Sequence, residues 1–297
     1  MSPDGQVMTL LVSEHGPFES LANLADGCRE LVREEFMQAA HPRAREPLDR
    51  LGWRGVYVES TLQRWRIPDA VPRRVLTCPE FDQEVSTLAE DDRIALGAVL
   101  RSIEDGDDLT PLLSKWATRV HAKRRDRFLA DWQLHHIHLR RGSGDLLFIH
   151  FTRQNAYMVA LRPHNSWAEH ELAHRVQRHW PGLIFTGTLA GLRPMQTVTD
   201  QELKAAQQAG LYVIFPDEQG MAMAGRGLTA SGHPMDLIDA ANHLEHALWA
   251  LERGEVLEVE DPRAWRPCLT EDLGHLGLWN SENDQVRWLA NLWPFPA

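Results

Sequence analysis

The 297-residue chain contains only three cysteines, and their positions argue against a disulfide framework. Cys28, Cys78 and Cys268 are odd in number and far apart in the sequence, and none belongs to a CxxC pair. Such cysteines suit a reducing compartment better than a set of paired disulfides. None has the setting of a recognisable nucleophile, so all three are interpreted as small packing residues.

Long apolar runs and several common motifs are also absent. No run of about 18 apolar residues occurs, and the first residues lack the basic start, apolar centre and cleavage site of a signal peptide. The sequence therefore predicts a cytoplasmic protein without a membrane span. It also lacks a Walker GxxxxGK[ST] motif, a GxGxxG motif after a strand and a GxSxG nucleophile elbow.

Net positive charge is lacking too, since 42 acidic residues outnumber 31 basic ones and give a net charge of -11. This balance argues against general coating of nucleic acid. The charge is uneven, however, because residues 115–180 contain 12 basic and 5 acidic residues and 9 of the 15 histidines. The segment is expected to face an anionic ligand such as RNA or the ribosome, or an acidic partner segment, unless it is only a solvated basic helix beside a sheet.

Apolar residues make up 43% of the chain, enough for more than one core. The proline-punctuated run at residues 68–74 marks a boundary. Three regions are predicted: a mainly helical part at 1–72, a basic, histidine-rich α+β domain at 75–182, and an acidic α+β region at 183–297. The expected class is α+β, with a small antiparallel sheet packed by helices in the middle region.

Hydrophobic spacing and turn residues predict the individual elements. Helices are expected at residues 18–39, 79–103, 200–209 and 235–253, and in a segment that a capping box opens at Ser166 and Pro181 closes. Strands are expected at 52–60, 133–139, 146–152 and 156–161, with a hairpin around 217–220. The turns between the last three of these strands are so short that the strands should be antiparallel.

The densest chemical cluster lies on these central strands. His136 and His138 share one face of a strand because alternate residues do, and His150 and Arg153 follow on the next strand. Two imidazoles beside an arginine suit RNA cleavage without a metal: one accepts the 2'-hydroxyl proton, the other protonates the leaving 5'-oxygen, and the arginine stabilises the phosphate charge. The same pair could instead hold a metal, or could simply pack and hydrogen-bond.

Residues 75–180 resemble the RelE-like ribonuclease toxins. The resemblance rests on two helices, a basic stretch and three closely spaced strands (HHIHL, LLFIHFT and AYMVALR), and on GSGDLLFIHF, which looks like their central strand after a short turn. It implies ribosome-associated RNA cleavage, with His136, His138, His150 and Arg153 as the matching candidates. Those toxins are usually small, basic, stand-alone chains, whereas this chain has acidic flanks that would then restrain the basic core.

A second motif, HELAH at residues 170–174, resembles the zinc-binding helix of metallopeptidases. The spacing places His170 and His174 on one helical face as zinc ligands, and Glu171 beside a metal-bound water as general base. Arg175 departs from the pattern, which prefers an uncharged residue there. Glu202, 32 residues after His170, is the best available third ligand.

Three hypotheses therefore remain open. The first is a toxin-like endoribonuclease that needs no cofactor. The second is a zinc-dependent peptidase, for which His243 and Glu245 are further possible ligands. The third is a non-catalytic binding or regulatory protein of a bacterial toxin or defence system, which would act through a protein partner.

Overall fold

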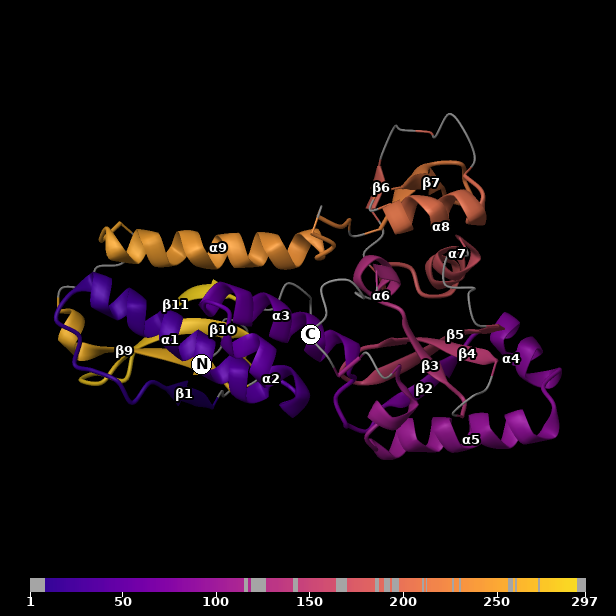
Figure 1. Ribbon diagram of the computed structural model, residues 1–297, viewed down its shortest axis with the longest axis horizontal. Coiled ribbons are helices and arrows are strands. Elements are labelled where there is room, and N and C mark those ends of the chain that lie inside the picture. Colours follow the sequence, from indigo (N-terminus) through magenta and orange to yellow (C-terminus); the bar gives the residue numbers. More distant parts are fainter. Residues whose placement is uncertain are drawn as a thin grey trace. The chain divides into compact units, whose positions relative to one another are not determined.

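The computed structural model describes residues 9–114, 117–118, 127–140, 144–163, 170–184, 187–189, 193, 198–209, 211, 213–225, 227–229, 231–255, 259, 261–271 and 273–292. The chain divides into two compact units. Unit 1 combines the residues up to Gln63 with those from Asp236 to Pro296, and unit 2 spans Arg64–Met235 (Figure 1). Both helices and sheets are present, so the predicted α+β class is confirmed.

Unit 2 is built on a four-stranded sheet in the order β2-β5-β4-β3. Its elements in chain order are β2 (Arg74–Thr77), α4 (Pro79–Ser86), α5 (Glu90–Asp105), η1 (Thr110–Leu112), α6 (Arg127–Trp132), β3 (His135–His138), β4 (Asp145–Phe151) and β5 (Asn155–Pro163). The pairs β3/β4 and β4/β5 are antiparallel, as the short turns predicted. Strand β2, which the sequence did not predict, pairs with β5 in parallel.

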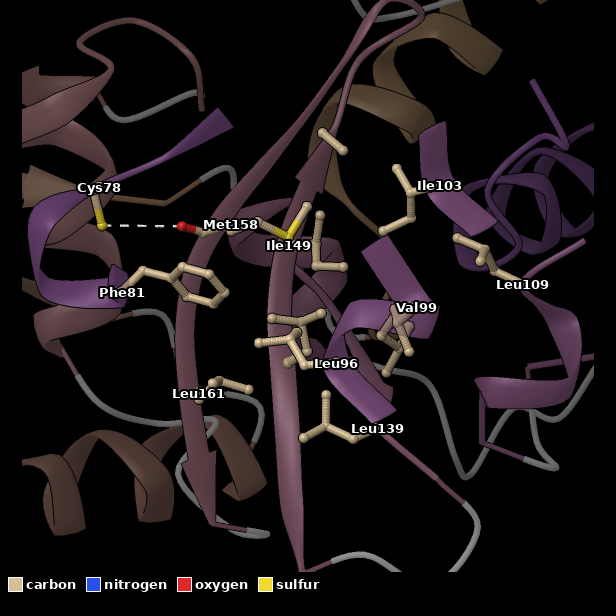
Figure 2. Packing of buried hydrophobic residues seen from close by; sticks show 13 residues of the cluster. Cys78, Phe81, Leu96, Val99, Ile103, Leu109, Leu139, Ile149, Met158 and Leu161 are labelled. Atoms are coloured by element: carbon tan, nitrogen blue, oxygen red, sulfur yellow. Dashed lines mark hydrogen bonds between the residues drawn. The ribbon is translucent and has the colours of Figure 1, made fainter. Parts of the chain in front are cut away.

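Two hydrophobic clusters cover the two faces of this sheet. On one face, Figure 2 shows residues of α4 and α5 packed on alternate strand residues; the cluster includes Phe81, Leu96, Val99, Ile103, Ile137, Leu147, Ile149 and Met158. On the other face the sheet packs on α7 (His170–His179), through Leu146, Phe148, Ala160, Leu172, Ala173 and Val176. The sheet of unit 2 is therefore a central layer between helices.

The rest of unit 2 contains a smaller antiparallel sheet in the order β6-β8-β7. Its strands are β6 (Gly187–Leu189), β7 (Ile214–Pro216) and β8 (Ala222–Ala224), and α8 (Asp200–Ala209) precedes β7. In the β7–β8 turn the Asp217 carboxylate accepts hydrogen bonds from the backbone N–H groups of Gln219 and Met221. The predicted helix at 200–209 and the hairpin around 217–220 are both confirmed.

Unit 1 joins the two ends of the chain in one antiparallel sheet, in the order β1-β9-β10-β11. Its elements are β1 (Leu10–Val12), α1 (Leu21–Ala39), α2 (Pro42–Asp49), α3 (Trp53–Arg66), α9 (Met235–Glu252), η4 (Pro262–Ala264), β9 (Trp265–Thr270), β10 (His275–Asn280) and β11 (Val286–Asn291). Leu10 pairs with Thr270. This division differs from the predicted regions 1–72, 75–182 and 183–297, because those assume that each unit is one continuous segment.

The strand predicted at residues 52–60 is wrong, because residues 53–60 belong to helix α3. Val56, Tyr57 and Val58 are all buried, so the alternating burial of a strand with one exposed face is not realised. Tyr57 packs edge-on against Phe36 of α1 and donates a hydrogen bond to the backbone oxygen of Leu292 (2.6 Å). Burial on several sides removed the amphipathic stripe that marks most helices. Among the described helices, none has the length and apolar character needed to cross a membrane.

Candidate functional site

The strand histidines of the predicted nuclease site share one face of the unit 2 sheet. His136 pairs with Phe148 and His138 with Leu146, and both of these partners belong to the cluster under α7. His150 lies two residues after Phe148 on β4, so alternation places it on the same face. The structure thus brings His136, His138 and His150 to the α7 side of the sheet.

The strand register places these three histidines at different distances from one another. Because His136 pairs with Phe148, it is the diagonal neighbour of His150, at roughly 7–8 Å between backbones. His138 pairs with Leu146, four residues from His150, which is roughly 13 Å along the strand. Arg153 is exposed in the turn between β4 and β5. Register therefore places His136 between His138, two residues away on β3, and His150 on β4, and Arg153 follows His150 by three residues in the turn.

His150 is held in a defined orientation. Its side chain is buried, with 7% of the residue exposed, and its Nδ1 lies 3.0 Å from the backbone oxygen of Gln133. A carbonyl only accepts hydrogen bonds, so Nδ1 donates, and the basic lone pair of the neutral ring is then on Nε2. The ring also contacts Tyr157, which packs edge-on against Trp180 at 5.3 Å.

The HELAH residues lie on α7, where the rings of His170 and His174 are stacked with their centroids 6.5 Å apart. The Asp200 carboxylate is 2.6 Å from Nδ1 of His170. Nε2 of His174 donates to the backbone oxygen of Pro216 (3.0 Å). A nitrogen that donates a hydrogen bond cannot bind a metal at the same time, so His174 could use its Nε2 for zinc only by breaking this contact.

The two glutamates of the predicted zinc site have other contacts. The Glu171 carboxylate lies 3.7 Å from Nε of Arg175 and 3.6 Å from Nη1 of Arg178. Glu202 accepts hydrogen bonds from the backbone and hydroxyl of Thr199, which cap α8 and lower the pKa of Glu202. Within the described part of the chain, His170, His174 and Glu202 do not form a group of donors within 4.8 Å of one another.

Arg175, the residue that departs from the peptidase pattern, lies on α7 and contacts both α4 and β5. It is 4% exposed, and its Nη1 donates to Glu84 of α4 (2.8 Å) and to the backbone oxygen of Val159 in β5 (2.9 Å). The second oxygen of Glu84 accepts from the backbone N–H of Leu161 (2.8 Å). Arg175 therefore has a structural role that the motif alone did not reveal.

A further group of donors was missed by the sequence reasoning. Cys78 at the start of α4, Glu80 in its first turn and His179 at the end of α7 bring their ligand atoms within 4.8 Å of one another. Glu80 Oε2 is 2.7 Å from His179 Nε2, and Glu80 Oε1 is 2.7 Å from Arg178 Nη1. The adjacent His179 is the main cause of a Glu80 pKa of about 2. No local spacing could have indicated this group, because about 100 residues separate its two halves.

Comparison with protein-family models, with curated proteins and with solved structures gave no match. The proposed function therefore rests on the chemistry of the chain's own side chains.

Proposed function

We propose that unit 2 is a metal-independent endoribonuclease of the RelE-like toxin type. The observation that carries the proposal is the placement of His136, His138 and His150 on one face of the β3–β4 sheet. The order of elements also supports it, since helices α4 and α5 precede three consecutive antiparallel strands, which is the order on which the resemblance rests. The substrate is RNA, because the reaction uses a 2'-hydroxyl.

The proposal gives each side chain a role. Nε2 of His150 removes the 2'-hydroxyl proton, and the 2'-oxygen attacks phosphorus. His136, the diagonal neighbour of His150, donates a proton to the departing 5'-oxygen, so the products are a 2',3'-cyclic phosphate and a 5'-hydroxyl end. Arg153 stabilises the charge that develops on the phosphate oxygens. His138, further along β3, binds a neighbouring phosphate of the RNA.

The test is cleavage of a labelled single-stranded RNA, alone and on ribosomes, with a chelator present. His136→Ala and Arg153→Ala should each lower the cleavage rate by about 10²–10⁴-fold. His243→Ala is the matched control, because this exposed histidine of α9 lies in unit 1. An RNA with a 2'-deoxy nucleotide at the cut should not be cleaved. Undiminished cleavage in both His136→Ala and Arg153→Ala would exclude the proposed site.

A zinc peptidase on α7 is the second candidate, and the contact between His170 and Asp200 favours it. A carboxylate on one ring nitrogen commonly orients a histidine whose other nitrogen binds zinc. This candidate predicts that Glu171→Gln abolishes peptide hydrolysis while zinc stays bound. Protein that contains zinc but loses none of it in His170→Ala would contradict the candidate.

A further inference from the structure

Cys78, Glu80 and His179 form a group that is separate from both sites considered above. The three side chains come from two elements, the start of α4 and the end of α7, and their sulfur, oxygen and nitrogen ligand atoms all lie within 4.8 Å of one another. Sulfur, imidazole nitrogen and carboxylate oxygen are the three donor types that zinc accepts in proteins.

The ligand atoms themselves are withdrawn from solvent. Cys78 is 2% exposed, and Glu80 Oε2 and His179 Nε2 are inaccessible to water. These two atoms are 2.7 Å apart and form a close carboxylate–imidazole pair. Metal binding releases protons from its ligands, so a zinc ion can take the place of the proton between this pair, beside the buried thiol.

The Cys78 thiol makes only weak contacts in its present orientation. Figure 2 shows Cys78 beside β5, where Sγ lies 3.9 Å from the backbone oxygen of Met158 and 3.8 Å from that of Val159. A thiol is only a weak hydrogen-bond donor, so loss of these contacts on deprotonation costs little. Rotation of one side chain would then direct the thiolate toward Glu80 and His179.

The charges of the surroundings are compatible with a divalent cation. A thiolate and a carboxylate together neutralise Zn²⁺. The nearby Arg178 contacts Glu80 through Oε1, which leaves Oε2 to the group, and its own charge is also met by Glu171 and Glu218. Cysteine sulfur selects zinc over harder cations such as Mg²⁺ or Ca²⁺.

We propose that Sγ of Cys78, Oε2 of Glu80 and Nε2 of His179 bind one zinc ion, with water as the fourth ligand, and that this zinc fastens the start of α4 to the end of α7. The site is independent of the proposed nuclease, because none of its ligands lies among the strand histidines. Its role is to stabilise the packing of α4 and α7 at β5.

The full-length protein is stripped with a chelator, reloaded with Zn²⁺ or Co²⁺, and analysed for metal content and absorption. We expect one metal per chain, a thiolate-to-cobalt charge-transfer band, and a higher Tm with zinc. Glu80→Gln and His179→Gln should weaken zinc binding by at least about 100-fold, since even residues that only support a ligand cost 10–100-fold. Cys78→Ser should abolish the cobalt band, whereas Cys28→Ser should preserve it.

Each outcome decides the proposal, and circular dichroism confirms that every variant is folded. Zinc that is lost in Glu80→Gln and His179→Gln but kept in His170→Ala supports it. Zinc that is lost only in His170→Ala overturns it in favour of the HELAH motif. A chain that binds no zinc, or a cobalt complex without a thiolate band, also overturns it. If Cys78→Ser fails to fold, the Glu80 and His179 variants decide.

Discussion

At the scale of single residues, Gly106 is the clearest backbone constraint. It ends α5 with a φ of +77°, and a Cβ there would lie 2.4 Å from the backbone nitrogen of Pro72. Gly106→Ala should lower the free energy of unfolding by more than about 1–2 kcal/mol, since the left-handed conformation alone costs that much. Gly97→Ala is the control in the same helix, because its Cβ would meet only Arg101 at 3.6 Å. Urea unfolding should show Gly97→Ala stabilised by about 0.5–1 kcal/mol.

The buried thiols of Cys28 and Cys268 in unit 1 lead to a prediction of how the stability of the protein depends on pH. Burial raises the pKa of Cys268 from 9.0 to about 12, and it raises the pKa of Cys28 as well. The native state therefore keeps protons that the unfolded chain releases above about pH 9. Stability should fall as the pH rises from 9, by about 1.4 kcal/mol per pH unit for each thiol.

Urea titrations between pH 8 and 10 measure this slope, since ordinary tyrosines stay protonated for most of that range. The variant with Cys28→Ala and Cys268→Ala is less stable at every pH but should show a shallower slope. An equal slope in the variant and the natural chain would show that the thiols are not the cause.

At the scale of elements, the ion pair between Arg175 and Glu84 joins α7 to α4 across β5. Arg175→Met removes a buried guanidinium, but Glu84 keeps its ion pair with Arg162, so the expected loss is that of a hydrogen bond to a charged group, about 1.5–3 kcal/mol. The comparison is Arg93→Ala, which removes an exposed pair with Glu90 in α5 worth about 0.2–0.5 kcal/mol. Thermal unfolding that shows equal losses in the two variants would contradict the structural role of Arg175.

At the scale of the whole molecule, the two units differ in continuity and in charge. Unit 2 is one segment with 21 basic and 20 acidic residues, whereas unit 1 is built from both ends of the chain and carries 10 basic and 22 acidic residues. We expect residues 64–235 to fold alone, and to bind RNA more tightly than the full chain at low salt because the acidic unit is removed. Screening by salt should shrink the difference between about 50 and 200 mM KCl.

Fluorescence anisotropy with a labelled RNA checks this expectation, and circular dichroism checks the folding of the fragment. A fragment that is folded but binds RNA no more tightly than the full chain at low salt would contradict the expectation that the acidic regions restrain the basic segment.

Local pattern alone determined much of unit 2. Strands β3, β4 and β5 were predicted as closely spaced segments separated by turn residues, and the shortness of those turns predicted that the strands are antiparallel. The period of two in a strand correctly grouped His136 with His138, and the spacing of HELAH placed His170 and His174 on one side of α7. These features depend only on residues that are near in sequence, so periodicity reports them directly.

Only the tertiary structure decided which distant residues meet. The pairing of β1 with β9, the alignment of His150 with His136, and the meeting of Cys78 and Glu80 with His179 all join segments that local periodicity treats separately. Helix α3 was mistaken for a strand because burial on several sides erased its stripe. Residue spacing fixes which face of an element a side chain occupies, whereas packing and strand register fix which faces come together, and those depend on the whole chain at once.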